Sequence, residues 1–269
     1  MAYWIEGEKN PETIVFVHGF NSSHLTWELI LPELTKKYRA VIYDQPGHGD
    51  SPAEGKDYSP KKMAARLKAL FDALKIEKAH LVGHSMGGRT SVEFAATYPE
   101  RVLSLSVADM HLLPIPQAKE QLPELFEKFD KVSAGLPNEF SNMEEATKAL
   151  SVFYSASEIQ FIVASLRKKV GGGLRLGSRP EVTNLYLAVG LSEDMTEQLK
   201  KIHVPFSFFA GDPSEESTVL KGVGVDHIRL HRPEVPVRII KGSGHSVQRT
   251  ALFAQELEEF IRRYSSPHL

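Results

Sequence analysis

A serine flanked by glycines is the first feature of this chain that could do chemistry. Residues 83–88 read Gly-His-Ser-Met-Gly-Gly, after the apolar run 79–82 and at the start of a helical pattern. Glycines at these positions allow a sharp strand-to-helix turn, in which the serine holds a strained backbone and projects its hydroxyl. Ser85 is therefore predicted to be a nucleophile rather than an ordinary serine at a helix start.

A serine hydroxyl is a poor nucleophile at neutral pH and needs a general base. In chains with this turn the histidine comes last in the sequence. His245 follows the expected final strand and precedes the expected terminal helix. No other histidine follows a late strand in this way, since His231 precedes Pro233 and His268 lies in the tail. We therefore predict that His245 is the base.

Acyl transfer also requires donors for the oxyanion that develops on the substrate, and backbone N–H groups commonly supply them. One donor is expected from Met86, the residue after the nucleophile, and another from the loop after an early strand. That loop is residues 18–20, His-Gly-Phe. We assign the second donor to Phe20, whose side chain could equally form a wall of the pocket.

The elements around these residues alternate between two periodicities. Short β-branched and aromatic runs predict strands at residues 14–17, 38–43, 79–83, 103–108, 206–210 and 237–240. Longer helical patterns occupy residues 25–37, 60–74, 86–98 and 252–264. This alternation predicts an α/β protein with a mostly parallel sheet and helices on both faces. Sites in such sheets lie outside the carboxyl ends of the strands, where Ser85 and His245 both fall.

The stretch from about Leu112 to Met195 breaks the alternation, because no core strand is evident in it. It holds amphipathic segments at residues 117–132, 143–154 and 158–170, followed by a glycine-containing loop. Helices inserted between two sheet strands predict a cap over the strand ends, although additional helical packing would give the same pattern. We divide the chain into a core of residues 1–111 and 196–269 and a cap of residues 112–195.

Four motifs together resemble the α/β-hydrolase superfamily from end to end. They are His-Gly-Phe at 18–20, Asp-Gln-Pro-Gly-His-Gly-Asp-Ser at 44–51, the serine motif at 83–88, and Gly-His at 244–245. The resemblance implies the α/β-hydrolase fold, with a central sheet, flanking helices and an inserted helical cap. It also implies that Asp44 and its loop are structural.

The acid of the family's triad usually follows the strand before the last, three residues beyond a glycine. After Gly211 that position is Ser214, which cannot carry a charge. Asp212 or Glu215 could serve instead after a loop rearrangement. Asp212 precedes a proline, however, which also suits a simple turn.

The chain is also similar to a branch of small bacterial esterases and their mitochondrial relatives, the abhydrolase 11-like group. That branch has its acid one strand earlier and a serine at the usual site. The resemblance therefore implies Asp109 as the acid, 24 residues after Ser85. Ser214 would then be an auxiliary hydrogen-bonding group, while a turn or helix-cap role for Asp109 remains the alternative.

The composition argues against several other classes of function. The chain has no cysteine, which excludes disulfides and thiolate chemistry, and its net charge of -2 provides no basic stripe for nucleic acid. Its apolar runs are far shorter than the roughly 20 residues of a membrane helix, and no secretory signal is evident. No His-Glu-x-x-His or phosphate-loop motif occurs. We expect a cytoplasmic monomer or dimer that needs no metal or cofactor and acts on small molecules.

The predicted reaction is cleavage of an ester or thioester through an acyl-enzyme on Ser85. Resemblance to the esterase branch implies short p-nitrophenyl esters as substrates and allows acyl-CoA thioesters. Phe153, Phe161 and Leu166 in the cap are predicted to set the acyl chain length.

Serine at the nucleophile position argues against epoxide and carbon–halogen hydrolysis, which use aspartate in related hydrolases. Carbon–carbon bond hydrolysis, lactone opening and peracid formation on the same triad remain alternatives. A slow-turnover ligand-binding receptor is another. A catalytically silent scaffold is disfavoured, because every catalytic position carries a competent residue.

Overall fold

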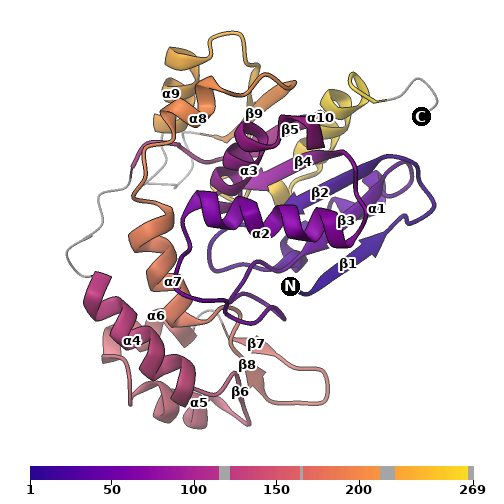
Figure 1. Ribbon diagram of the computed structural model, residues 1–269. Coiled ribbons are helices and arrows are strands. Elements are labelled where there is room, and N and C mark those ends of the chain that lie inside the picture. The colour runs from indigo at the N-terminus through magenta and orange to yellow at the C-terminus, as the bar shows by residue number, and fades with distance from the viewer. Residues whose placement is uncertain (115–121, 164–165, 213–221, 266–269) are drawn as a thin grey trace.

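The computed structural model describes residues 1–114, 122–163, 166–212 and 222–265. A seven-stranded sheet lies at its centre, in the order β1-β3-β2-β4-β5-β9-β10 (Figure 1). The strands are β1 (Tyr3–Glu6), β2 (Thr13–Val17), β3 (Arg39–Tyr43), β4 (Ala79–His84), β5 (Val102–Ala108), β9 (Phe206–Gly211) and β10 (Val237–Ile240). Only β1 is antiparallel to its neighbour. The predicted mostly parallel sheet is therefore confirmed.

The central strands are almost entirely buried because both faces of the sheet are covered. All five residues of β2 are buried. Val15 and Val17 belong to one apolar cluster, whereas Ile14 and Phe16 belong to a second cluster. This division follows from the alternation of side chains along a strand.

Helices cover both faces of the sheet (Figure 1). On one face α2 (Pro60–Ala73) and α3 (Met86–Thr97) contribute side chains to the first cluster. On the other, α1 (Leu31–Leu34) and α10 (Ala251–Arg262) contribute to the second. The helices α8 (Thr196–Lys200) and α9 (Val223–His231) pack with the first cluster, and neither was predicted from the sequence, nor was β1.

The predicted helix over residues 25–37 was wrong. A 3₁₀ turn, η1 (His24–Trp27), and the short α1 replace it. Pro32 explains the break, because proline has no N–H and is tolerated only in the first turn of a helix. It occupies the first turn of α1.

The cap segment, residues 112–195, contains small elements that are separate from the central sheet. They are α4 (Leu122–Gly135), β6 (Glu139–Phe140), α5 (Met143–Leu150), α6 (Ala156–Val163), β7 (Arg167–Lys168), β8 (Leu174–Arg175), α7 (Pro180–Leu185) and the π-helix η4 (Tyr186–Gly190). Strands β6, β8 and β7 form their own antiparallel sheet. Figure 1 shows most of this segment projecting to one side of the sheet.

The predicted helix over residues 158–170 also extended too far. Helix α6 ends at Val163, and residues 167–168 form β7 instead. Gly171, Gly172 and Gly173 all have positive φ, at 91°, 101° and 84°. Glycine adopts such angles without the strain that a side chain would impose, so this run forms the turn between β7 and β8.

Candidate active site

Ser85 occupies a strained turn between β4 and α3. Its φ is 52° and its ψ is -127°, values that a residue other than glycine adopts only under constraint. Two backbone hydrogen bonds hold the turn: Ser85 N–H donates to Ala108 O at 2.8 Å, and Gly88 N–H donates to Ser85 O at 2.7 Å. A Cβ atom on Gly87 would lie 2.2 Å from Val17 O, so close packing requires glycine beside the serine.

The three side chains predicted to form the triad lie together. Nε2 of His245 is 2.9 Å from Ser85 Oγ, and Nδ1 of His245 is 2.7 Å from Asp109 Oδ2. An ionised carboxylate can only accept, so Nδ1 carries the proton and Nε2 is free to accept from the serine hydroxyl. The residues come from the ends of β4 and β5 and from the loop after β10.

Asp109 is held in place from both sides. Its Oδ1 accepts from Gly211 N–H at 2.9 Å, and its own N–H donates to Phe209 O at 2.7 Å. Its φ is 47°, in the left-handed region. These contacts aim Oδ2 at His245.

The alternative acid Asp212 makes different contacts. Its N–H donates to Ser243 O at 2.7 Å, and Oδ2 accepts from Gly242 N–H at 3.4 Å. Asp212 therefore binds the loop that leads to His245, while the imidazole Nδ1 contacts Asp109. Ser214 and Glu215 lie outside the described residues.

The loop predicted to supply an oxyanion donor lies directly against the serine. A Cβ atom on Gly19 would be 3.0 Å from Ser85 Cβ and 2.9 Å from His84 Nδ1. Within the described residues, neither Phe20 N–H nor Met86 N–H donates to a protein acceptor. Both groups are thus available to a ligand beside Ser85.

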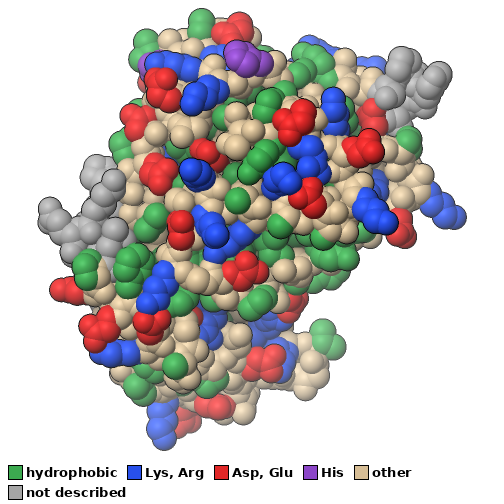
Figure 2. Space-filling view, viewed as in Figure 1, with side chains coloured by type: hydrophobic (Ala, Val, Ile, Leu, Met, Phe, Trp, Pro, Cys, Tyr) green, Lys and Arg blue, Asp and Glu red, His purple; other side chains and the backbone are tan. Residues whose placement is uncertain are grey.

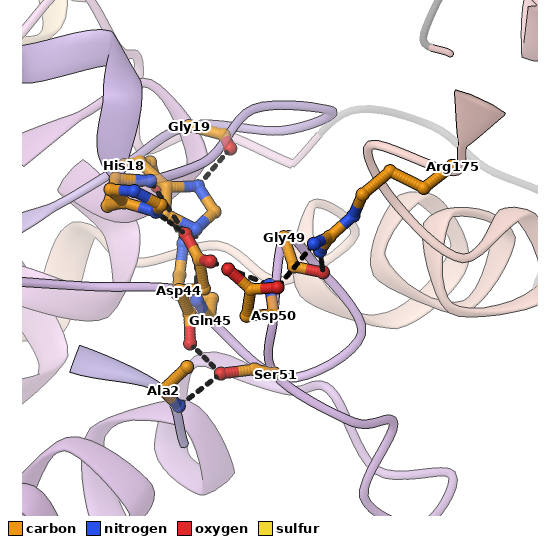
Figure 3. A network of polar contacts seen from close by, with 10 residues as sticks. Ala2, His18, Gly19, Asp44, Gln45, Gly49, Asp50, Ser51 and Arg175 are labelled. Atoms are coloured by element: carbon orange, nitrogen blue, oxygen red, sulfur yellow. Dashed lines mark hydrogen bonds and ion pairs between the residues drawn. The ribbon is translucent and has the colours of Figure 1, made fainter. Parts of the chain in front are cut away.

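His18 fixes the backbone of this loop, as Figure 3 shows. Its Nε2 accepts from Gln45 N–H at 2.9 Å, so its Nδ1 carries the proton and donates to Gly19 O at 2.8 Å. Gln45 Nε2 also donates to His18 O at 2.6 Å. The peptide between Gly19 and Phe20 is planar and trans, so holding the Gly19 carbonyl sets the direction of the Phe20 N–H. Burial lowers the pKa of His18, which keeps the ring neutral.

Asp44 anchors the adjoining loop, residues 44–51. The fully buried carboxylate accepts from His24 N–H at 2.7 Å, from His24 Nδ1 at 2.9 Å and from Asp50 N–H at 2.7 Å. Burial acts to raise the pKa of Asp44, but these hydrogen bonds and the neighbouring His18 outweigh it and lower the pKa. Its contacts are those of a structural group.

Loop 44–51 also binds the cap segment. Gly49 N–H donates to Gly177 O at 2.9 Å, and Arg179 N–H donates to Gly47 O at 2.7 Å. The guanidinium of Arg175 contacts both Gly49 O and the Asp50 carboxylate (Figure 3). Loop 44–51 therefore contacts residues 18–20 on one side and the cap segment on the other.

Arg89, which the sequence analysis did not identify, lies on α3 one turn after Ser85 and is 1% exposed. Nε donates to Gly190 O at 3.0 Å, and Nη1 donates to His111 O at 3.3 Å and Leu113 O at 3.1 Å. Nη2 donates to Glu193 O. These carbonyls lie where the chain leaves the core for the cap segment and where it returns. The sequence held one signal for this role of Arg89, which was a charged residue one turn into a helix that is otherwise buried.

The predicted pocket residues are less clearly placed. Phe153 and Leu166 are partly buried and pack against the apolar cluster of the cap segment itself. Phe161 lies in α6, but its side chain is outside the described part of the chain. A role for these residues in the substrate pocket stays a prediction.

The surface and side-chain clusters offer few other sites. Acidic and basic side chains intermingle over the face drawn in Figure 2. Among the described residues, no group of three or more His, Asp or Glu side chains could hold a metal ion. No helix in those same ranges is long and apolar enough to cross a membrane.

Known proteins share this architecture. A protein of Bacillus subtilis with the provisional name 2-succinyl-6-hydroxy-2,4-cyclohexadiene-1-carboxylate synthase is 26% identical over 95% of this chain and 92% of its own. The 2-(acetamidomethylene)succinate hydrolase of Mesorhizobium japonicum is 28% identical over 87% of this chain and 81% of its own.

Solved structures agree with these sequence matches. A crystal structure of E-2-(acetamidomethylene)succinate hydrolase aligns with a TM-score of 0.68 and 26% identity, covering 97% of this chain and 94% of that one. A thermophilic esterase from Thermogutta terrifontis aligns with a TM-score of 0.72 at 20% identity, covering 98% and 94%. The sequence profile of the alpha/beta hydrolase fold family matches residues 12–168. The chain belongs to the alpha/beta hydrolase fold family.

Proposed function

We propose that this hydrolase cleaves carboxylic esters or thioesters through an acyl-enzyme on Ser85. The observation that carries the proposal is the connected arrangement of three side chains, with 2.9 Å between Ser85 Oγ and His245 Nε2 and 2.7 Å between His245 Nδ1 and Asp109 Oδ2. This is the relation of nucleophile, base and orienting acid that acyl transfer requires.

In the first step Ser85 Oγ attacks the substrate carbonyl carbon while His245 Nε2 takes the hydroxyl proton. The N–H groups of Phe20 and Met86 stabilise the oxyanion, and Asp109 stabilises the imidazolium. His245 then protonates the leaving alcohol or thiol, whose bond to the acyl carbon breaks.

In the second step His245 removes a proton from water, which attacks the acyl-enzyme. The acid product leaves when His245 returns that proton to Ser85 Oγ. The protein groups named here suffice for both steps, so no cofactor is required. A small-molecule substrate, a cytoplasmic setting and a monomeric or dimeric state belong to the same proposal.

The names of the relatives do not single out esters, and the Bacillus subtilis relative has the provisional name of a synthase. One relative is a hydrolase of 2-(acetamidomethylene)succinate, and a structural neighbour at 20% identity is an esterase. Ester cleavage is preferred here because the acid follows β5, as it does in the esterase branch that the sequence resembles.

The test is hydrolysis of p-nitrophenyl esters from acetate to palmitate, with Ser85→Ala as the control. Turnover of about 1 per second or faster that disappears in Ser85→Ala is the expected result. The optimum chain length would then measure the pocket. Absence of Ser85-dependent turnover across the whole series would refute the general esterase and direct attention to carbon–carbon bonds, lactones or ligand retention.

A further inference from the structure

Two arginines face each other across the small sheet of the cap segment. Strands β7 and β8 are antiparallel, and Arg167 is the direct partner of Arg175. Directly opposite residues project their side chains to the same face of a sheet. Like charges at such positions repel, and Glu139, which lies opposite Arg175 on the other side, supplies a negative charge in the same row.

Only one of the two arginines has a carboxylate partner among the described residues. Arg175 contacts Asp50 and the Gly49 carbonyl, which shows that this face of the hairpin looks toward loop 44–51 (Figure 3). The next basic residues along the chain differ, since Lys168 is exposed and Lys169, just after β7, pairs with Glu139. Asp50 thus pairs with Arg175, and Glu139 pairs with Lys169.

Arg167 is partly buried and lacks such a partner. Its Nε is buried without a hydrogen-bond acceptor, and its guanidinium makes no ion pair in the part of the chain that the structure describes. A buried donor that forms no hydrogen bond destabilises the folded state. Native structures rarely keep such a group unless something else binds it.

The position of Arg167 relates it to the catalytic side of the molecule. Burial lowers the pKa of His18, and the positive charge of Arg167 acts in the same direction. Its partner Arg175 contacts Gly49 in loop 44–51, and Gln45 of that loop binds His18, whose neighbour Gly19 lies against Ser85. Arg167 therefore lies on the face of the hairpin that looks toward the loops beside Ser85.

We propose that Arg167 binds a carboxylate of the substrate, which makes the preferred substrates esters or thioesters that also carry a free carboxylate. The planar guanidinium suits this role, because it can donate two parallel hydrogen bonds to a carboxylate. The reaction in this inference rests on the proposed function, whereas the carboxylate site itself does not.

The kinetic test compares two esters of equal chain length, p-nitrophenyl hexanoate and mono-p-nitrophenyl adipate. Arg167→Gln should lower kcat/KM for the adipate ester about tenfold to hundredfold, mainly through KM, and leave the hexanoate ester within about twofold. Arg167→Lys should recover part of the loss. Lys168→Gln, the adjacent residue on the other face of β7, is the matched control and should change neither substrate.

Equal losses on both esters in Arg167→Gln would assign Arg167 a structural role and overturn the inference. The inference also fails if hexanoate is hydrolysed but adipate is not preferred and Arg167→Gln has no effect. Neither outcome would affect the proposed esterase reaction.

A binding test keeps the two proposals separate. Adipate dianion is titrated into Ser85→Ala by calorimetry, with Ser85→Ala/Arg167→Gln as the comparison. Saturable binding that weakens about tenfold or more without Arg167 supports the carboxylate site even if no ester is hydrolysed. Binding that is absent, or unchanged by the substitution, contradicts it.

Discussion

Nε2 of His84 lies 2.8 Å from the backbone carbonyl oxygen of His245, and their rings are 4.8 Å apart. A carbonyl only accepts, so Nε2 of His84 carries the proton. Burial, with a further contribution from His245, lowers the pKa of His84 to about 3, and the ring therefore stays neutral. The residue before the proposed nucleophile thus holds the backbone of the proposed base.

Replacing His84 tests this positioning role. His84→Phe keeps a ring of similar size but removes the donor, so kcat should fall about tenfold to hundredfold while KM changes little. His84→Gln, which retains an N–H donor, should recover part of the loss. Steady-state kinetics on the best p-nitrophenyl ester provides the measurement, and a change confined to KM would contradict the assignment.

Substitution of the two candidate acids should separate their roles. Asp109→Asn should lower kcat by up to about 10⁴, by analogy with the serine-protease aspartate, because the amide favours the wrong imidazole tautomer. Asparagine also tolerates the positive φ of this position, so the fold should persist. Asp212→Asn should lower kcat less than about tenfold. If the Asp212 variant lost more activity than the Asp109 variant, the assignment would have to be reversed.

Loss of Arg89 should destabilise the fold more than a surface substitution does. Arg89→Met keeps the apolar stem but leaves four buried or partly buried carbonyls without their donor. Urea denaturation should show a free energy of unfolding lower by about 3 kcal/mol or more. Lys62→Met, at an exposed position on α2, is the control and should shift it by less than about 0.5 kcal/mol.

Stability should also depend on pH through the buried histidines. Burial is the main cause of the lowered pKa of His18, His48 and His84, and it brings the pKa of His48 and His84 to about 3. In the unfolded chain these rings take up protons below about pH 6.5, whereas in the folded chain they do so only at lower pH. The unfolded state then binds more protons, so stability is full above that pH and falls on acidification.

Urea unfolding at pH values between 7.5 and 5 measures this effect. Each such histidine should contribute a slope approaching about 1.4 kcal/mol per pH unit below its unfolded pKa. His48→Gln, outside the proposed catalytic groups, should make the slope shallower by about one such increment. A wild-type stability that does not change over this range would contradict the prediction.

The sequence anticipated the elements whose signal is local. Strand β2 is a continuous apolar run, and α2 begins with Ser59 and Pro60, where the serine side chain caps the helix. The serine motif predicted the turn at Ser85 because few residues other than glycine fit two positions before and after the serine. The structure places His245 within hydrogen-bonding distance of both Ser85 and Asp109, although Asp109 was expected through a family resemblance and not from its own surroundings.

What could not be anticipated depends on contacts between distant segments. Strand β1 is short and partly exposed, and it pairs only with β3 along one edge. The strands of the cap segment have two residues each, too few to produce a periodic pattern. Arg89 and His84 act on carbonyl groups far along the chain, which no spacing in the sequence reveals.

The contacts of loop 44–51 constrain how the cap segment of this protein could be replaced. The same few residues contact Gly177 and Arg179 on one side and, through Gln45, the carbonyl of His18 on the other. A chimera carrying the cap of another hydrolase would have to supply matching partners for Gly47, Gly49 and Asp50. Without them, a graft intended to change selectivity would also disturb the groups proposed to stabilise the transition state, so substrate range and reaction rate would change together.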